Sequence, residues 1–314
     1  MTRLRAILRS SKTWIKFQEL NREGWLEAFK RSQTQRQILN TPPIHTEKIG
    51  TSEVRVLTWR RDWINTLWSL KSFYSYSQEK YPLFIHDGGL ERYQFQKLQE
   101  HFPTATIISK SAADNIVVPL LSERKLQNCI NYRLVSPFGR RIIDFYLMSR
   151  AEKIISIDAD VLFFQKPNEI LNTSIKNNFY NRDAGYFYSM ELSELNTAFG
   201  IKPIPLINAG LSLVWRESVD FQKIDEWLDN RQLFGDSWLT EQTIHALLST
   251  IYGITLLPDA YALGKTWGLD NNVISKHYPS RTPLLYFEGM QTLIENGFLN
   301  NLAAVNSTDD KNQQ

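Results

Sequence analysis

Cysteine is almost absent from this chain of 314 residues, which contains only Cys129. A single cysteine excludes a disulfide framework within the chain and any cysteine-rich metal site. Long apolar runs are also missing, because no stretch reaches the roughly 18 apolar residues that a membrane-spanning helix needs. A secretory signal peptide is not predicted either, since Arg3, Arg5 and Arg9 interrupt the apolar residues at the start of the sequence. These absences predict a cytoplasmic protein.

Basic residues are concentrated near the N-terminus, although the net charge of the chain is only +3. The first 36 residues contain nine lysines and arginines, interleaved with apolar residues such as Trp14, Trp25 and Phe29. Residues 1–45 are predicted to form a basic amphipathic helical arm that is interrupted at Pro42. Such an arm either makes peripheral contact with an anionic membrane surface or packs on the main domain with a solvated basic face. No nucleic-acid partner is predicted, because the rest of the chain has no basic stripe.

Strand-like and helix-like segments alternate through residues 46–299. In the first half the strand-like segments are residues 53–59, 81–86 and 105–109, and the helix-like segments are residues 63–76, 90–101 and 140–149. In the second half strands are predicted at residues 183–190, 207–215 and 253–257, and helices at residues 221–230 and 238–250. This alternation predicts an α/β fold with a mainly parallel sheet flanked by helices on both faces. Residues 300–314 are predicted to be a disordered polar tail.

Two carboxylates interrupt an apolar run at residues 154–164, the most informative segment of the sequence. Mostly apolar residues precede Asp158, and Val161 to Phe164 follow Asp160 directly, which predicts a buried strand. Burying a carboxylate without a partner costs several kcal/mol, so these side chains need a counter-charge. A hard divalent cation would supply it and leave coordination positions for phosphate oxygens. The alternative is an ordinary strand that ends in a polar turn, with both aspartates solvated.

Two more polar residues are predicted at strand ends, Thr58 after the first strand and Asp87 after the second. In open α/β sheets, ligands bind outside the carboxyl ends of the strands. Both residues are therefore expected to converge with the aspartate pair on one site. Asp87 has a second interpretation, because an Asp-Gly-Gly sequence favours a turn by itself.

Three further motifs follow the aspartate pair. They are Asn208-Ala209-Gly210 at the start of a predicted strand, Glu241-Gln242 in a predicted helix, and His277-Tyr278 near the end. This order of motifs resembles the nucleotide-sugar glycosyltransferases of the A-type (GT-A) fold, which is a Rossmann-like mixed α/β sheet. It is most similar to the retaining family that includes glycogenin and bacterial lipopolysaccharide galactosyltransferases. The resemblance covers residues 53–287. It implies sugar transfer from a nucleoside-diphosphate sugar, by preference a UDP-sugar, to a saccharide or other hydroxyl acceptor, with retention of anomeric configuration.

The resemblance also implies roles for individual residues. Asp158, Asp160 and His277 would bind Mn²⁺ or Mg²⁺, and an imidazole ligand suits manganese well. The residues predicted to bind the donor are Thr58, Asp87, Asp158, Gly210 and Arg281, and those predicted at the catalytic centre are Asn208, Glu241 and Gln242.

The sequence departs from the family pattern at two places. Glu241 replaces an aspartate, and the usual glycine and lysine are missing after His277, where Arg281 would pair with phosphate instead. Each assignment also has a structural alternative. His277 would be a surface-loop histidine, Arg281 a solvated arginine, and Glu241 an acid in the first turn of a helix. Asn208 and Gly210 would form a turn that opens a strand.

Two other functions compete with glycosyl transfer. A haloacid-dehalogenase-like phosphohydrolase also uses Asp-x-Asp and Mg²⁺ after an apolar strand. That superfamily has threonine or valine four positions after the first aspartate, where this sequence has Leu162. The other competitor is a non-catalytic protein that binds a nucleotide sugar. In a transferase the acceptor is predicted to bind near residues 179–205 and 259–275, where Trp267 would stack on the apolar face of a sugar.

Overall fold

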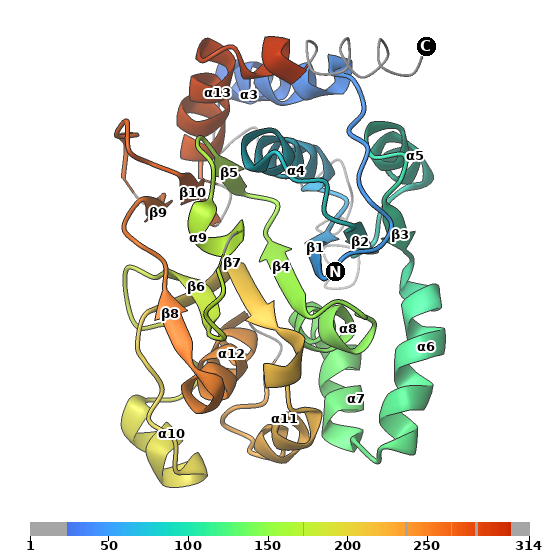
Figure 1. Ribbon diagram of the computed structural model, residues 1–314, viewed down its shortest axis with the longest axis vertical. Coiled ribbons are helices and arrows are strands. Elements are labelled where there is room, and N and C mark those ends of the chain that lie inside the picture. The colour runs from blue at the N-terminus through green and yellow to red at the C-terminus, as the bar shows by residue number, and fades with distance from the viewer. Residues whose placement is uncertain (1–23, 172, 236–237, 265, 280–281, 303–314) are drawn as a thin grey trace, which may run out of the picture.

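A mixed seven-stranded sheet forms the centre of the computed structural model, which describes residues 24–302 except residues 172, 236–237, 265 and 280–281 (Figure 1). The strand order is β3-β2-β1-β4-β7-β6-β8. The strands are β1 Ser52–Thr58, β2 Leu83–Asp87, β3 Thr106–Ile108, β4 Lys153–Ile157, β6 Asn178–Arg182, β7 Ile207–Trp215 and β8 Ile254–Leu256. β7 runs antiparallel to its neighbours β4 and β6, and the other neighbouring pairs are parallel. The predicted mixed, mainly parallel α/β sheet is therefore confirmed.

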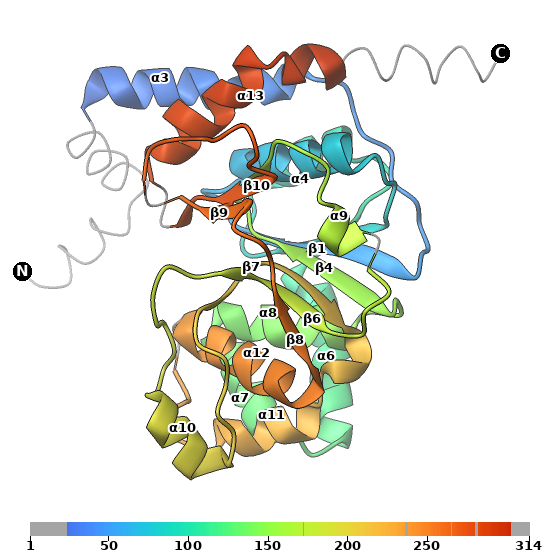
Figure 2. The same cartoon turned by 60° about the vertical axis from the view of Figure 1, so that its left-hand side comes forward.

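Helices cover both faces of this sheet (Figure 2). One face carries α4 Trp63–Ser77, with α3 Trp25–Arg36 and α13 Gln291–Glu295 outside it, and the other carries α8 Pro137–Leu147, α12 Trp238–Tyr252, α7 Gln127–Val135 and α11 Phe221–Leu228. The remaining α-helices in the described residues are α5 Arg92–His101, α6 Lys110–Glu123, α9 Asn168–Leu171 and α10 Leu192–Phe199. Side chains alternate across β1, because Val54 and Val56 belong to the apolar cluster that contains Leu67 of α4, whereas Leu57 packs in the cluster that contains Ile142 of α8. β1 is buried on both faces for this reason.

A second, three-stranded sheet lies beside the first. It consists of β5 Val161–Phe163, β10 Ser275–His277 and β9 Tyr261–Leu263. β10 pairs antiparallel with β5, and His277 lies opposite Val161. The small sheet therefore brings a segment from near the end of the chain next to the residues that directly follow β4. A π-helix, Leu285–Met290, follows β10.

The predicted secondary structure differs from the observed one at several places, since β6, α10, β9 and β10 were not predicted. The strand predicted at residues 183–190 is wrong, because the strand β6 ends at Arg182 and the following residues form bends and irregular structure. Asp183 starts this change of direction, since its side chain accepts a hydrogen bond from the N–H of Ala184. No element was predicted for residues 110–135, which form α6 and α7. Pro119 inside α6 obscures the helical pattern there.

The predicted N-terminal arm is described only in part. Residues 1–23 and 303–314, and with them most of the arm and of the predicted tail, lie outside the described residues. α3 follows residue 24 and ends at Arg36. No helix in the described part of the chain combines the length and the apolar character needed to cross a bilayer.

Candidate active site

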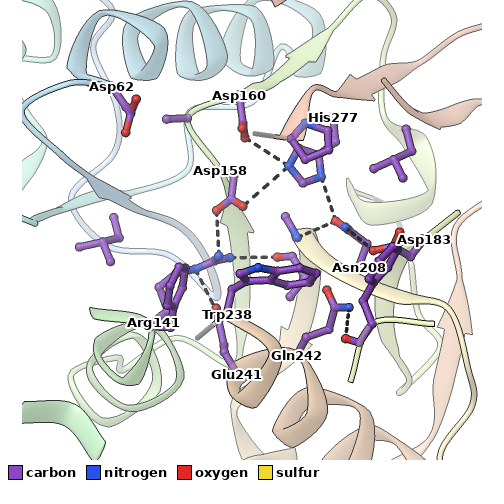
Figure 3. A pocket seen from close by; sticks show the side chains of 18 of the residues that line it. Asp62, Arg141, Asp158, Asp160, Asp183, Asn208, Trp238, Glu241, Gln242 and His277 are labelled. Atoms are coloured by element: carbon purple, nitrogen blue, oxygen red, sulfur yellow. Dashed lines mark hydrogen bonds and ion pairs between the residues drawn. The ribbon is translucent and has the colours of Figure 1, made fainter. Parts of the chain in front are cut away.

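A cavity of about 440 Å³ opens at the edge of the sheet where β1 and β4 end and β7 begins (Figure 3). Because β7 is antiparallel to β4, the amino end of β7 faces the same edge as the carboxyl end of β4. The residues that line the cavity include Trp59, Asp62, Asn65, Arg141, Asp158, Asp160, Asp183, Phe187, Asn208, Gly210, Trp238, Glu241, Gln242 and His277. Seven of the predicted site residues are therefore brought together here.

The backbone around the aspartate pair is fixed from three sides. The N–H of Asp158 donates to the carbonyl of Gly210 at 2.8 Å, and the hydroxyl of Ser69 on α4 donates to the carbonyl of Asp158 at 2.8 Å. The N–H of Tyr278 donates to the carbonyl of Asp160 at 2.9 Å. The side chains of Asp158 and Asp160 remain 30% and 23% exposed, so both carboxylates reach the cavity.

His277 completes a cluster of metal-ligand type. Its Nε2 lies 3.2 Å from Oδ1 of Asp160 and 3.9 Å from Oδ2 of Asp158. One ligand atom from each of the three residues lies within 4.8 Å of the others. Two carboxylate oxygens and one imidazole nitrogen fit Mn²⁺ well, and they fit Mg²⁺ less well because that ion prefers oxygen ligands.

Asn208 determines which nitrogen of His277 faces the aspartates. Its Nδ2 donates to the carboxylate of Asp183 at 2.9 Å, so its Oδ1 must face the other way, where it accepts from the N–H of Gly210 at 3.0 Å. The same Oδ1 lies 2.9 Å from Nδ1 of His277, which must therefore be the protonated nitrogen. Nε2 is left with a lone pair directed at Asp158 and Asp160, as in histidines that bind a metal.

The titration of the cluster follows from its burial and its charges. Burial lowers the pKa of His277, but the carboxylates of Asp160 and Asp158 outweigh it, so the pKa of His277 is raised overall. Burial also raises the pKa of Asp158, although Arg141 opposes the shift.

Gly210 is a position where no side chain fits. A Cβ built on Gly210 would lie 2.3 Å from Cε1 and 2.6 Å from Nδ1 of the His277 ring. Atoms that are not bonded to each other do not approach so closely. Gly210 therefore makes room for the imidazole of His277. It also lines the cavity, and its contact with the donor stays a prediction.

Arg141 of α8 links the aspartate pair to α12 and was missed in the sequence. Its Nη1 lies 2.9 Å from Oδ1 of Asp158, and its Nε lies 3.2 Å from Oε1 of Glu241. Its Nη2 also donates to the hydroxyl of Ser156 and to the carbonyl of Ala209. Burial lowers the pKa of Arg141, but the two carboxylates outweigh it and keep the guanidinium charged. A signal does exist in the sequence, because the arginine lies on the apolar face of a helix.

Glu241 and Gln242 lie in the first half of α12, below the aspartate pair (Figure 3). Glu241 is 2% exposed, and burial raises its pKa to about 7 even though Arg141 opposes the shift. The neighbouring His245 has its Nε2 3.8 Å from Oε1 of Glu241, and burial keeps this histidine neutral by lowering its pKa to about 3. Nε2 of Gln242 donates to the carbonyl of Phe187 at 2.9 Å. The base of the cavity therefore offers one carboxyl group with a pKa of about 7 and one amide that is oriented by a hydrogen bond.

Two predicted donor-binding residues, Thr58 and Asp87, do not line the cavity. The hydroxyl of Thr58 is buried and lies 2.6 Å from the hydroxyl of Thr66. Asp87 accepts hydrogen bonds at 2.6 Å from the N–H groups of Gly89 and Leu90, the turn role named as its alternative. Arg281 lies outside the described residues.

No protein-family model and no curated protein matches this sequence. The fold does match solved structures. The apo form of mouse xyloside xylosyltransferase 1 superposes with a TM-score of 0.51 at 11% identity, over 76% of this chain and 99% of that chain. The galactosyltransferase LgtC, in complex with donor and acceptor sugar analogs, gives a TM-score of 0.51 at 12% identity, over 81% of this chain and 95% of that chain. At such low identity the likeness concerns the fold, and this chain has the A-type fold that was predicted from its motifs.

Proposed function

We propose that this chain is a metal-dependent glycosyltransferase that uses a nucleoside-diphosphate sugar, by preference a UDP-sugar, and a hydroxyl acceptor. The convergence of Asp158, Asp160 and His277 at the edge of an A-type sheet carries the proposal. A phosphohydrolase that attacks phosphate through its first aspartate is less favoured, because one oxygen of Asp158 is held by Arg141.

The chemistry follows from the residues that line the cavity. A divalent cation held by Asp158, Asp160 and His277 would supply positive charge for the departing nucleoside diphosphate. Asn208 keeps His277 in the tautomer that binds a metal. Glu241 and Gln242 are buried at the base of the cavity, where hydrogen bonds to sugar hydroxyls replace hydrogen bonds to water. Retention of configuration is supported by the resemblance, and proton NMR of the product anomer decides it.

Replacing Asp160 by alanine is expected to abolish metal-dependent donor binding. The loss should exceed the roughly 10- to 100-fold that removal of an outer-shell partner costs, because a direct ligand is removed. Isothermal titration with UDP-glucose, UDP-galactose and UDP-xylose, with and without Mn²⁺, measures the effect, and GDP-mannose tests the nucleotide preference. Asp259→Ala is the matched control, since the side chain of Asp259 is 97% exposed and is not among the residues that line the cavity. Metal-independent donor binding that survives Asp160→Ala would contradict the proposal.

We further propose that α3 contacts an anionic membrane surface. Trp25, Leu26 and Phe29 are 69%, 76% and 61% exposed on this helix. The preceding 23 residues add six basic side chains to these apolar ones, a combination that suits anionic lipid. α3 is also fixed to the wall of the cavity, because Nε2 of Gln35 donates to Oδ1 of Asn65, a lining residue, at 2.8 Å. Docking through α3 would therefore orient the cavity relative to the membrane.

A triple variant in which Trp25, Leu26 and Phe29 are replaced by serine is expected to bind more weakly to phosphatidylcholine vesicles that contain phosphatidylserine. Three large apolar side chains would no longer enter the interface, so vesicle co-sedimentation should fall by roughly 10-fold or more. Ile49→Ser is the control, because Ile49 is 90% exposed on a different segment. Unchanged sedimentation of the triple variant would contradict the proposal. So would a concentration-dependent dimer that the triple variant abolishes, since the apolar face would then bind a second copy.

A further inference from the structure

Trp238 is an exposed aromatic residue at the mouth of the cavity. It is 42% exposed and still lines the cavity, at the first residue of α12. Residues three and four positions apart lie on the same face of a helix, so Trp238 shares its face with Glu241 and Gln242. Those two residues are only 2% and 3% exposed. This face of α12 therefore runs from an open aromatic ring at the mouth to buried polar groups at the base (Figure 3).

Phe187 extends the aromatic surface. Its ring centroid lies 5.8 Å from that of Trp238, with an angle of 49° between the planes. Gln242 donates to the carbonyl of Phe187, and the N–H of Ser189 donates to the hydroxyl of Thr243 at 2.9 Å. The segment that carries Phe187 is therefore tied twice to α12, and the two rings and the amide of Gln242 form one connected wall.

The opposite part of the cavity has a different character. There Trp59, Asp62 and Asn65 follow β1, and ligands of open sheets bind outside the carboxyl ends of the strands, so the proposed nucleotide is expected on this side. The cation cluster lies at the end of β4, so a donor that reaches both would leave the wall on α12 to a second substrate. A large ring with a partly exposed face suits a ligand that presents C–H groups on one side and hydroxyls at its rim.

We infer that Trp238 and Phe187 form the acceptor subsite, and that the acceptor is a saccharide whose pyranose ring stacks on Trp238 with a hydroxyl directed at Gln242. The inference rests on the proposed function and selects one class among its hydroxyl acceptors. It also relocates the stacking residue, because Trp267 is 66% exposed but is not among the residues that line the cavity.

The test compares Trp238→Ala, Trp238→Phe and wild type in the full chain with Mn²⁺. The probes are the methyl β-glycosides of glucose, galactose, mannose and N-acetylglucosamine, assayed with the UDP-sugar that titrates best. For Trp238→Ala the KM for the glycoside should rise by roughly 5- to 10-fold. Trp238→Phe should recover most of this loss, because phenylalanine keeps a flat ring. The Kd for the donor, measured by titration, should change by less than about 2-fold. Thermal unfolding verifies that each variant folds.

Trp267→Ala is the matched control and should leave the KM for the glycoside at its wild-type value. The inference is overturned if Trp238→Ala weakens donor binding as much as it raises the acceptor KM, since the indole would then belong to the donor subsite. It is also overturned if the wild-type protein hydrolyses the UDP-sugar slowly without acceptor and none of the glycosides accelerates the consumption of this donor. Absence of Mn²⁺-dependent donor binding in the wild type is a different result, which would refute the proposed function itself.

Discussion

Replacing Gly210 by alanine is expected to remove metal binding even though no ligand is changed. The new methyl group would overlap the imidazole of His277, with Cε1 at 2.3 Å and Nε2 at 2.9 Å. Either the ring moves away from Asp158 and Asp160, or β7 moves and breaks the 2.8 Å hydrogen bond between Gly210 and the N–H of Asp158. Either movement would separate His277 from Asp158 and Asp160. We expect Mn²⁺ affinity to fall by roughly 100-fold or more, at or beyond the upper end of outer-shell effects.

The measurement is Mn²⁺ binding by titration or by electron paramagnetic resonance, together with the thermal unfolding temperature. Gly235→Ala is the matched control, because a Cβ on Gly235 would meet only the hydroxyl of Thr240 at 3.4 Å, an ordinary contact. Combining Gly210→Ala with His277→Ala should relieve the overlap and raise the unfolding temperature, but metal binding should remain absent. A Gly210→Ala variant that binds Mn²⁺ with wild-type affinity would show that His277 is not a ligand.

Replacing Arg141 by methionine is expected to destabilise the protein more than removal of either of its carboxylate partners. Its guanidinium compensates Asp158 and Glu241 at once, and the side chain of Arg141 is only 8% exposed. Removing one partner of a buried ion pair costs about 3–5 kcal/mol of unfolding free energy, because an uncompensated charge remains. Urea denaturation without metal measures the loss. The loss should grow as the pH rises above about 7, because Glu241 is ionised there in the wild type, and it should shrink below pH 7, where Glu241 is protonated in both proteins.

A double variant distinguishes the loss of this ion pair from the loss of packing. Glu241→Gln in the Arg141→Met background removes the carboxylate that has lost its partner. It should therefore raise the unfolding free energy of that variant by about 1–3 kcal/mol, whereas the same replacement should not stabilise the wild type. Arg150→Met is the control, because Arg150 is exposed just after α8. Strictly additive effects of the two replacements would mean that the contact at 3.2 Å contributes no coupling free energy.

The strongest patterns in the sequence predicted the fold well. The strand predicted at residues 207–215 matches β7, and the helix predicted at residues 140–149 overlaps α8. β7 is buried on both faces of the sheet, and α8 packs its apolar residues into the core, so local pattern and tertiary packing agree in both segments. At residues 183–190 the local sequence pattern and the tertiary packing disagree. Aromatic residues there imitate a strand, but Asp183 hydrogen-bonds to Asn208 and to the following backbone, and the chain leaves the sheet.

Short motifs predicted that Asp158, Asp160, Asn208 and His277 would lie close together, and the structure places all four around one cavity. Each of these residues stands in a motif of two or three consecutive residues that a sequence displays directly. Arg141 has no such motif, and its role depends on two carboxylates from other elements that only the tertiary structure brings within reach. Thr58 shows the opposite error. It lies at a strand end as predicted, but side chains alternate along a strand, and its hydroxyl points to Thr66 on α4.

The pairing of β10 with β5 also has a consequence for how the protein is made. His277 is contributed by a strand from the last part of the chain, and it reaches Asp160 only when that strand has docked beside β5. Contacts between segments so far apart in sequence form late, because closing a long loop costs entropy before the contact can stabilise the structure. During synthesis the segment that carries β10 must therefore leave the ribosome before His277 can meet Asp158 and Asp160. On the proposed function, metal binding would therefore report that β10 has docked beside β5, and a chain that lacks β10 would also lack the ligand His277.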